Sequence, residues 1–161
     1  MGRRRELDRE LALTDGFRSL EDEVYIGLVR TTWLLDAKVH QAYALAKLSP
    51  SQYNVLRILR GSRQPLSCSE ISDRMVTRDS DLTRLLGGLE RRGLVERQRS
   101  EADARRVENQ ISSEGIALMA QLDQPVDEAI RTQLKGLGGD RLSELADLLE
   151  EVRRAARTSD P

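Results

Sequence analysis

The sequence predicts a mainly α-helical protein with one small β wing, and three observations support this class. Apolar residues recur at spacings of three and four over most of the 161 residues, which is the period of a helix face. Residues typical of helix caps precede several of these segments. One short segment, residues 94–111, instead has the composition of two strands joined by a polar tip.

Composition limits the class of protein further. A chain of this length with 39% hydrophobic residues supports one domain, whose core must be mainly aliphatic because aromatic residues make up only 3%. No apolar run approaches the roughly 20 residues of a membrane span, and the arginine-rich start lacks a hydrophobic signal region. A single cysteine excludes an internal disulfide and fits a reducing cytoplasm. We therefore expect a cytoplasmic protein with no membrane partner.

Residues 1–47 are predicted to form an N-terminal extension and a long helix. Residues 1–16 mix both charges and are expected to be frayed or to form a short helical extension. From residue 19 to residue 46, apolar side chains recur at helical spacing. Because residues 31–35 are apolar on more than one side, we expect them to be buried against their own domain and against a second surface.

Residues 48–111 are predicted to fold as a helix-turn-helix followed by a wing. Ser49 is expected to cap a first helix, and Ser67 with Glu70 forms a capping box at the start of the next. Thr77 is the predicted cap of the helix after that. The apolar stripe of this last helix consists of Leu82, Leu85, Leu86 and Leu89.

The opposite face of that last helix is polar. A rotation of about 100° per residue places there Ser80, Arg84, Gly87 and Arg91, flanked by Asp81 and Thr83. Arginine on the outer face of a short helix suits the base edges and phosphates of a DNA major groove. The alternative is an ordinary amphipathic helix with a solvated face, which is the commoner case for any single helix.

The predicted hairpin favours DNA binding over that alternative. Gly93 is expected to end the helix, and Val107 and Ile111 on the returning strand are expected to point inward alongside Asn109. Four arginines crowd this hairpin: Arg97, Arg99, Arg105 and Arg106. The planar fork of arginine suits phosphate and minor-groove contacts, and Asp103 is placed to orient Arg105.

Charge is concentrated in this part of the chain. The formal net charge is only −1, yet residues 84–106 contain seven arginines and four acidic residues. Local excess matters more than the total for nucleic-acid binding.

Residues 112–161 are predicted to form C-terminal helices. Ser112 is the expected cap of a helix that extends past Pro125, the glycine-rich segment 136–139 interrupts it, and a final amphipathic helix covers 141–158. The apolar surface of both ends of the chain suits a two-fold dimer, which would place two DNA-reading helices about one DNA turn apart. A monomeric helical bundle is the alternative.

Several segments occur in an order that points to one family. They are Leu48 to Leu56, Glu70-Ile71, Thr83 to Leu86, Leu89 to Arg97, Asp103 to Arg105, and Ser112 with Gly115. Together they resemble the winged helix of the MarR (multiple antibiotic resistance regulator) family of bacterial transcription factors, and the resemblance covers nearly the whole chain. It departs from the family pattern at Gly87-Gly88, inside the DNA-reading helix, and at Asn109, which breaks a usually apolar strand.

The resemblance implies roles for particular residues. The helix face around Ser80, Thr83 and Arg84 would read the major groove, Arg105 would enter the adjacent minor groove, and the terminal helices would interlock two subunits. The residues expected to contact DNA are Ser69, Thr77, Ser80, Asp81, Thr83, Arg84, Arg91, Arg97, Arg99, Asp103, Arg105 and Arg106.

The resemblance also implies a small effector, often phenolic or anionic, between the dimerisation helices and the winged helix. The first-helix side chains that would line its site are Tyr25, Arg30, Trp33, His40 and Tyr43. Taken individually, each of them is better explained as a core or surface residue.

Enzymatic and metal chemistry have little support. His40 and Cys68 are the single histidine and cysteine, so one subunit cannot assemble a Cys/His zinc site, and neither residue lies in a nucleophile motif. No phosphate-binding glycine loop or dinucleotide fingerprint occurs, and we expect no cofactor. Cys68, at the start of a helix, is interpreted as a small structural residue, with a redox-sensing thiol as the alternative.

The resulting hypothesis is a homodimeric transcription regulator that binds a pseudo-palindromic double-stranded operator. It would act as a repressor that a small ligand or chemical signal releases. The alternative is a winged helix used for protein contact, without a DNA target.

Overall fold

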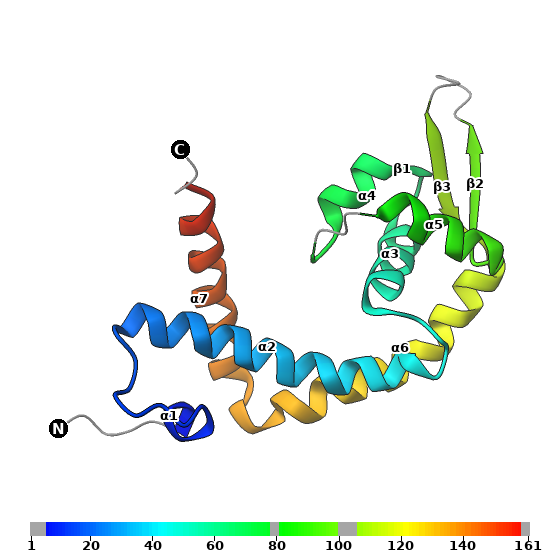
Figure 1. The fold of residues 1–161 in the computed structure, drawn as a ribbon. Coiled ribbons are helices and arrows are strands. Elements are labelled where there is room, and N and C mark those ends of the chain that lie inside the picture. The colour runs from blue at the N-terminus through cyan, green and yellow to red at the C-terminus, as the bar shows by residue number, and fades with distance from the viewer. Residues whose placement is uncertain (1–5, 78–80, 100–105, 159–161) are drawn as a thin grey trace. The chain divides into compact units, whose positions relative to one another are not determined.

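The computed structural model describes residues 6–77, 81–99 and 106–158, and in these ranges the chain is mainly helical with one three-stranded antiparallel sheet of order β1-β3-β2 (Figure 1). The predicted fold class is therefore confirmed. The chain divides into two compact units, Met1–Val39 and His40–Pro161.

The first unit contains α1 (Glu6–Glu10) and most of α2 (Leu20–Ala44). Residues 6–10 form the short helical extension that was one of the two expectations for the N-terminus. Glu10 pairs with Arg30 of α2 at 3.5 Å. Large apolar side chains of α2 are exposed on the single chain: Leu20, Val24, Tyr25, Val29, Trp33 and Leu34.

The second unit begins with the end of α2 and continues into α3 (Pro50–Gly61). Ser49 caps α3, as predicted, through a reciprocal capping box with Gln52. Three aliphatic side chains of α3 are buried in the core, namely Val55, Leu56 and Leu59. This helix positions the rest of the winged helix, because α4, α5, α6 and β3 all contact it.

The helix-turn-helix consists of α4 (Cys68–Arg74) and α5 (Leu82–Arg91). The predicted capping box of Ser67 and Glu70 is confirmed at the start of α4. The prediction that Thr77 caps the following helix is wrong, because α5 begins at Leu82 and its cap is Asp81. The Asp81 carboxylate accepts a hydrogen bond from the Arg84 amide, and an anion is favourable at the positive end of a helix.

The apolar stripe of α5 is largely as predicted. Leu82, Leu86 and Leu89 are buried, whereas Leu85 is half-buried, because it borders a surface hollow described below. Gly93 ends the helix with a φ of +70°, which glycine adopts at no steric cost. Its amide donates to the Glu90 carbonyl at 2.8 Å, and the next amide donates to the Leu89 carbonyl at 3.0 Å.

The wing is the antiparallel pair β2 (Val95–Arg99) and β3 (Val107–Ile111), in which Val95 pairs with Ile111 and Arg99 with Val107. The two-residue strand β1 (Leu66–Ser67) pairs with β3 and was not predicted. Ile111 and Asn109 are buried as expected, and Val107 is on the same face of β3, but its expected burial is wrong, since it is 38% exposed. Val107 lies at the outer end of the ladder, which projects beyond α5 (Figure 1).

The chain ends with α6 (Ser113–Leu134), the short 3₁₀ helix η1 (Lys135–Leu137) and α7 (Gly139–Thr158). Ser112 caps α6 as predicted, and α6 continues through Pro125. Arg60 of α3 donates two hydrogen bonds, of 2.9 and 2.8 Å, to the Asp123 carboxylate of α6. Large apolar side chains of α7 are exposed, namely Leu145, Leu148 and Val152. Within the described ranges, no helix is both long and apolar enough to cross a membrane.

Candidate nucleic-acid interface

The outer face of α5 presents a polar surface anchored at its first turn. Asp81 holds both ends of Arg84, since its carboxylate accepts from the Arg84 backbone amide at 3.3 Å and also pairs with the Arg84 guanidinium. Even so, the Arg84 side chain is 82% exposed, and Thr83 beside it is also exposed. The first turn of α5 therefore offers an arginine whose backbone and side chain are both oriented by one carboxylate.

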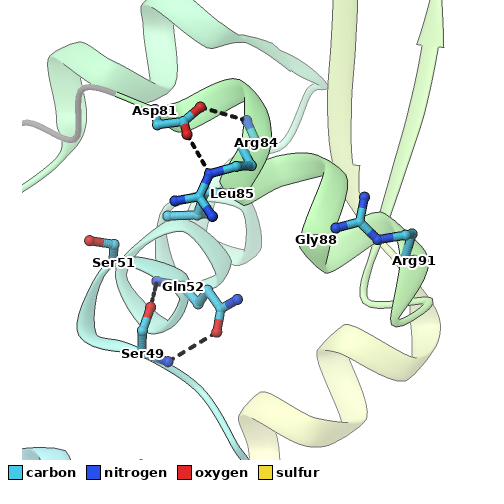
Figure 2. Close-up of a pocket in the computed structure, with 8 residues that line it drawn as sticks. All are labelled: Ser49, Ser51, Gln52, Asp81, Arg84, Leu85, Gly88 and Arg91. Atoms are coloured by element: carbon cyan, nitrogen blue, oxygen red, sulfur yellow. Dashed lines mark hydrogen bonds and ion pairs between the residues drawn. The ribbon is translucent and has the colours of Figure 1, made fainter.

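A hollow of about 340 Å³ lies between this face of α5 and the N-terminus of α3 (Figure 2). Its lining consists of Ser49, Ser51, Gln52, Asp81, Arg84, Leu85, Gly88 and Arg91. Arg84 and Arg91 supply its cationic side, and the serines and Gln52 supply neutral polar groups (Figure 2). Sequence reasoning missed the contribution of α3, because nothing in the pattern of residues 49–52 shows which later helix will face them.

Gly88 of the glycine pair in α5 lines this hollow. A methyl group added at Gly88 would lie 3.8 Å from the Arg91 guanidinium and 4.0 Å from the Gln52 amide nitrogen. These are ordinary contact distances, so a methyl group would fit there and would only narrow the hollow. For Gly87, the nearest atoms to an added methyl belong to the guanidinium groups of Arg91 and Arg97.

The arginines of the wing differ in their surroundings. Arg99 is exposed, and Arg106 is 57% exposed with an ion pair of 3.7 Å to Glu70. The pKa of Glu70 lies below its usual value, mainly because the Ser67 hydroxyl and amide donate to its carboxylate, with Arg106 adding a smaller attraction. Arg97 is only 20% exposed and faces the inside of the wing.

Arg97 takes part in a polar row across the sheet. Its Nε donates to Asn109 Oδ1 at 3.2 Å, and its Nη1 lies 3.3 Å from a carboxylate oxygen of Glu90 in α5. The Asn109 amide nitrogen donates to the Leu66 carbonyl at 2.8 Å. Asn109, an apparent departure within an apolar strand, is therefore fully buried with both ends of its amide bonded.

Arg92 has a structural role that the sequence did not reveal. Its guanidinium donates to the carbonyl oxygens of Ala46 and Lys47, each at 2.8 Å, in the turn that follows α2. Lys47 has a φ of +54°, so the chain reverses there. The fork of Arg92 thus joins the end of α5 to that turn and satisfies carbonyl groups at a helix end.

The other predicted DNA-contacting residues are only partly covered by the structure. Ser69 and Thr77 are exposed, on α4 and just after it. Ser80, Asp103 and Arg105 lie outside the described residues, so their predicted contacts stay predictions. Cys68 is half-buried with a free thiol at the first position of α4.

The predicted effector residues fall in two groups. In the first unit, the Arg30 guanidinium lies over the Trp33 ring at 4.8 Å, and both Tyr25 and Trp33 are strongly exposed. In the second unit, His40 contacts Tyr43 at a ring distance of 5.3 Å. Tyr43 is buried and stacks on Tyr53 at 4.6 Å, which gives it a core role.

The described residues contain no cluster of histidine, cysteine and carboxylate side chains that could hold a metal ion. What the described residues bring together here are the arginines and polar groups of α3, α5 and the wing.

Comparisons with known proteins bear on the family and the fold of the chain. Residues 46–106 match the model of the MarR family. The chain is 30% identical over 138 residues to the HTH-type transcriptional regulator PecS of Dickeya dadantii (strain 3937), covering 84% of this chain and 83% of PecS.

Solved structures show the same fold. A MarR transcription factor from Planctomyces limnophilus is 36% identical, with a TM-score of 0.64 over 84% of this chain and 98% of that one. NadR, solved in complex with 4-hydroxyphenylacetate, is 27% identical, with a TM-score of 0.68 over 85% of this chain and 96% of that one.

Proposed function

The chain belongs to the MarR family of transcription regulators, and we propose that it is a homodimer that binds a pseudo-palindromic operator in double-stranded DNA and represses transcription. The observation that carries the proposal is the outer face of α5, where an exposed Arg84 is oriented by Asp81 beside a polar, arginine-lined hollow. In a helix-turn-helix, the second helix enters the major groove with its N-terminal residues toward the bases.

The lining of the hollow predicts different DNA contacts for the first and last turns of α5. Arg84 in the first turn would reach base edges, together with Thr83 and the neighbouring Ser80. Arg91 in the last turn lies at the other end of the hollow, where a phosphate is the expected partner. Ser51 and Gln52 of α3 would face the same strand of DNA, because they line the same hollow.

The wing would contact the adjacent minor groove. Arg99 at the end of β2 and Arg106 just before β3 are exposed, and Arg105 lies between them in the sequence. Arginine suits this position because its flat guanidinium fits a narrow groove of strongly negative potential.

Dimerisation would use the terminal helices. Exposed apolar side chains recur along α2, for example Leu20 and Val24, and along α7, for example Leu148 and Val152. Apolar side chains that recur along one helix form a patch, and such patches mark protein–protein contacts. Two-fold pairing through them would bring two α5 helices to successive turns of one face of the duplex.

Release by a small aromatic or anionic effector is the proposed regulation. NadR of this family was solved with 4-hydroxyphenylacetate, an aromatic anion. In this chain, Arg30 stacked on Trp33, with the exposed Tyr25 on the same helix, supplies a cation and aromatic faces of the kind such a ligand needs. The protein would act in the cytoplasm, where its operator lies.

The test is salt-dependent binding to duplex fragments recovered with the protein from its native genome. Replacing Arg106 with alanine should weaken binding to all sequences and lower the salt slope by about 1, whereas Arg84→Ala should cost about 1–3 kcal/mol and relax sequence preference. Arg141→Ala, an exposed arginine of α7, is the matched control and should bind as the wild type does. If neither Arg84 nor Arg106 affects binding, a winged helix that contacts protein becomes the better account.

A further inference from the structure

We propose that Arg97 is a positioning residue that fixes the angle between the wing and α5 through Asn109 and Glu90, and that it does not contact a phosphate. This inference rests on the proposed DNA-binding function. It separates Arg97 from the other arginines of the hairpin, with which it was grouped on sequence alone.

The register of the sheet creates the row. Leu66, Asn109 and Arg97 stand directly opposite one another on β1, β3 and β2. Directly opposed side chains on antiparallel strands lie on the same face, so Arg97 and Asn109 meet without distorting the ladder. The row continues from Arg97 to Glu90, one residue before the end of α5.

The bonding of Asn109 makes the row a single unit. Its amide nitrogen donates to the Leu66 carbonyl and its amide oxygen accepts from Arg97 Nε, so each end of the amide is bonded within the protein. Asn109 is 0% exposed, and a buried amide that lost one of these bonds would bear the full cost of desolvation. The amide therefore holds Arg97 against the sheet.

The surroundings of Arg97 also distinguish it from a phosphate ligand. Its side chain is 20% exposed, compared with 57% for Arg106 and 82% for Arg84. Two of its nitrogens are engaged inside the protein, one by Asn109 and one by Glu90. A phosphate would have to use the donors that Asn109 and Glu90 leave, on a side chain that is only 20% exposed.

The position of the row explains why it matters for binding. α5 and β2 are joined by only a few residues around Gly93, so the row is a second connection between the last turn of α5 and the sheet. With the row intact, the wing reaches the minor groove at a set angle while α5 occupies the major groove. Without it, DNA binding must also order the wing, and that ordering reduces affinity.

The experiment compares three single variants, and the double variant of Asn109→Leu with Arg97→Gln, in the full-length protein on one operator duplex over a series of salt concentrations. Asn109→Leu removes both amide bonds with a side chain of similar size, Arg97→Gln removes the guanidinium, and Arg99→Gln is the matched control on the exposed part of β2. Because Asn109 is neutral and buried, any effect of its replacement on binding cannot come from a lost phosphate contact.

We expect Asn109→Leu and Arg97→Gln each to weaken binding about tenfold, the equivalent of one charge-assisted hydrogen bond, with the salt slope unchanged. The double variant should bind no more weakly than either single one, because both interrupt the same row. Arg99→Gln should lower the slope by about 0.9.

Two results would overturn the inference. One is a salt slope lowered by about 0.9 in Arg97→Gln, and the other is wild-type affinity in Asn109→Leu. If Asn109→Leu does not fold, Glu90→Leu removes the acceptor at the exposed end of the row and should reproduce the loss of affinity. A wild-type protein that binds no duplex would refute the proposed function itself, whereas normal binding by Asn109→Leu and Glu90→Leu would refute only this inference.

Discussion

Replacing Gly115 with alanine should destabilise the protein at the junction between the wing and α6. Gly115 lies in the first turn of α6, and a methyl group there would clash with the carbonyl oxygen of Leu94 and lie 2.7 Å from Cγ1 of Ile111. Carbon atoms in contact are normally about 3.5–4.0 Å apart. Ser112 also donates to the Gly93 carbonyl at 2.6 Å, so α6 begins tightly against the backbone that follows α5.

The magnitude follows from two opposing effects. Alanine favours a helix over glycine by about 1 kcal/mol, whereas overpacking a close contact costs about 1–3 kcal/mol. The upper part of that range applies, because the clashing atom belongs to the backbone and is held by a 3.1 Å hydrogen bond from the Ser112 amide. We expect a net loss of about 1–2 kcal/mol, which lowers Tm by roughly 2–8 °C for a chain of this size.

The assay is thermal unfolding followed by circular dichroism at one protein concentration, since association affects Tm. Gly139→Ala is the matched control, because Gly139 is also at the start of a helix and a methyl group there meets no atom within 4 Å. Its Tm should be unchanged or higher. Equal Tm values for the two variants would show that the start of α6 does not pack against Leu94 as described.

Three further results are expected. Asp123→Asn should reduce the free energy of unfolding above about pH 4, because hydrogen bonds from Arg60 lower the pKa of Asp123. The difference from wild type, measured by urea unfolding, should shrink as the pH falls through that lowered pKa. A difference that stays constant with pH would contradict the pairing. Ser67→Ala should cost about 1 kcal/mol by removing the cap of α4, which urea unfolding would also detect, with an unchanged midpoint as the contrary result. Leu148→Glu should convert the proposed dimer to a monomer in light scattering, and a dimer that persists would exclude this face of α7 from the interface.

Local rules predicted much of the fold. The caps at Ser49, Ser67 and Ser112 and the glycine at position 93 were identifiable because each depends on groups within a few residues. The cap of α5 was misplaced because four residues of suitable type precede it, and propensity alone does not choose among Thr77, Asp79, Ser80 and Asp81.

Features that depend on distant parts of the chain were not predictable. The two-residue strand β1 is too short to show a pattern, and only its pairing with β3 defines it. The alternation of apolar residues correctly assigned Val107 to the face of β3 that holds Asn109 and Ile111. It carries no information on how far along the strand that face is covered by helices, so it did not predict the exposure of Val107. Likewise, the partner of Asn109 is a carbonyl 43 positions earlier, so sequence reasoning could register the residue only as an exception.

Sequence alone also does not show which arginines of the interface are bonded within the protein, and their number affects the salt slope of DNA binding. Sequence alone counts seven arginines between residues 84 and 106, which at about 0.9 per phosphate would give a salt slope of roughly 6 per subunit. In the structure, Arg92 donates hydrogen bonds to two carbonyl groups, and Arg97 bonds to Asn109 and Glu90. The remaining five set an upper bound of about 4.5 per subunit, and Arg84, which would read a base, lowers it further. A measured slope near 6 would therefore mean that Arg92 and Arg97 leave these partners when DNA binds, or that basic residues outside 84–106 also contact phosphate.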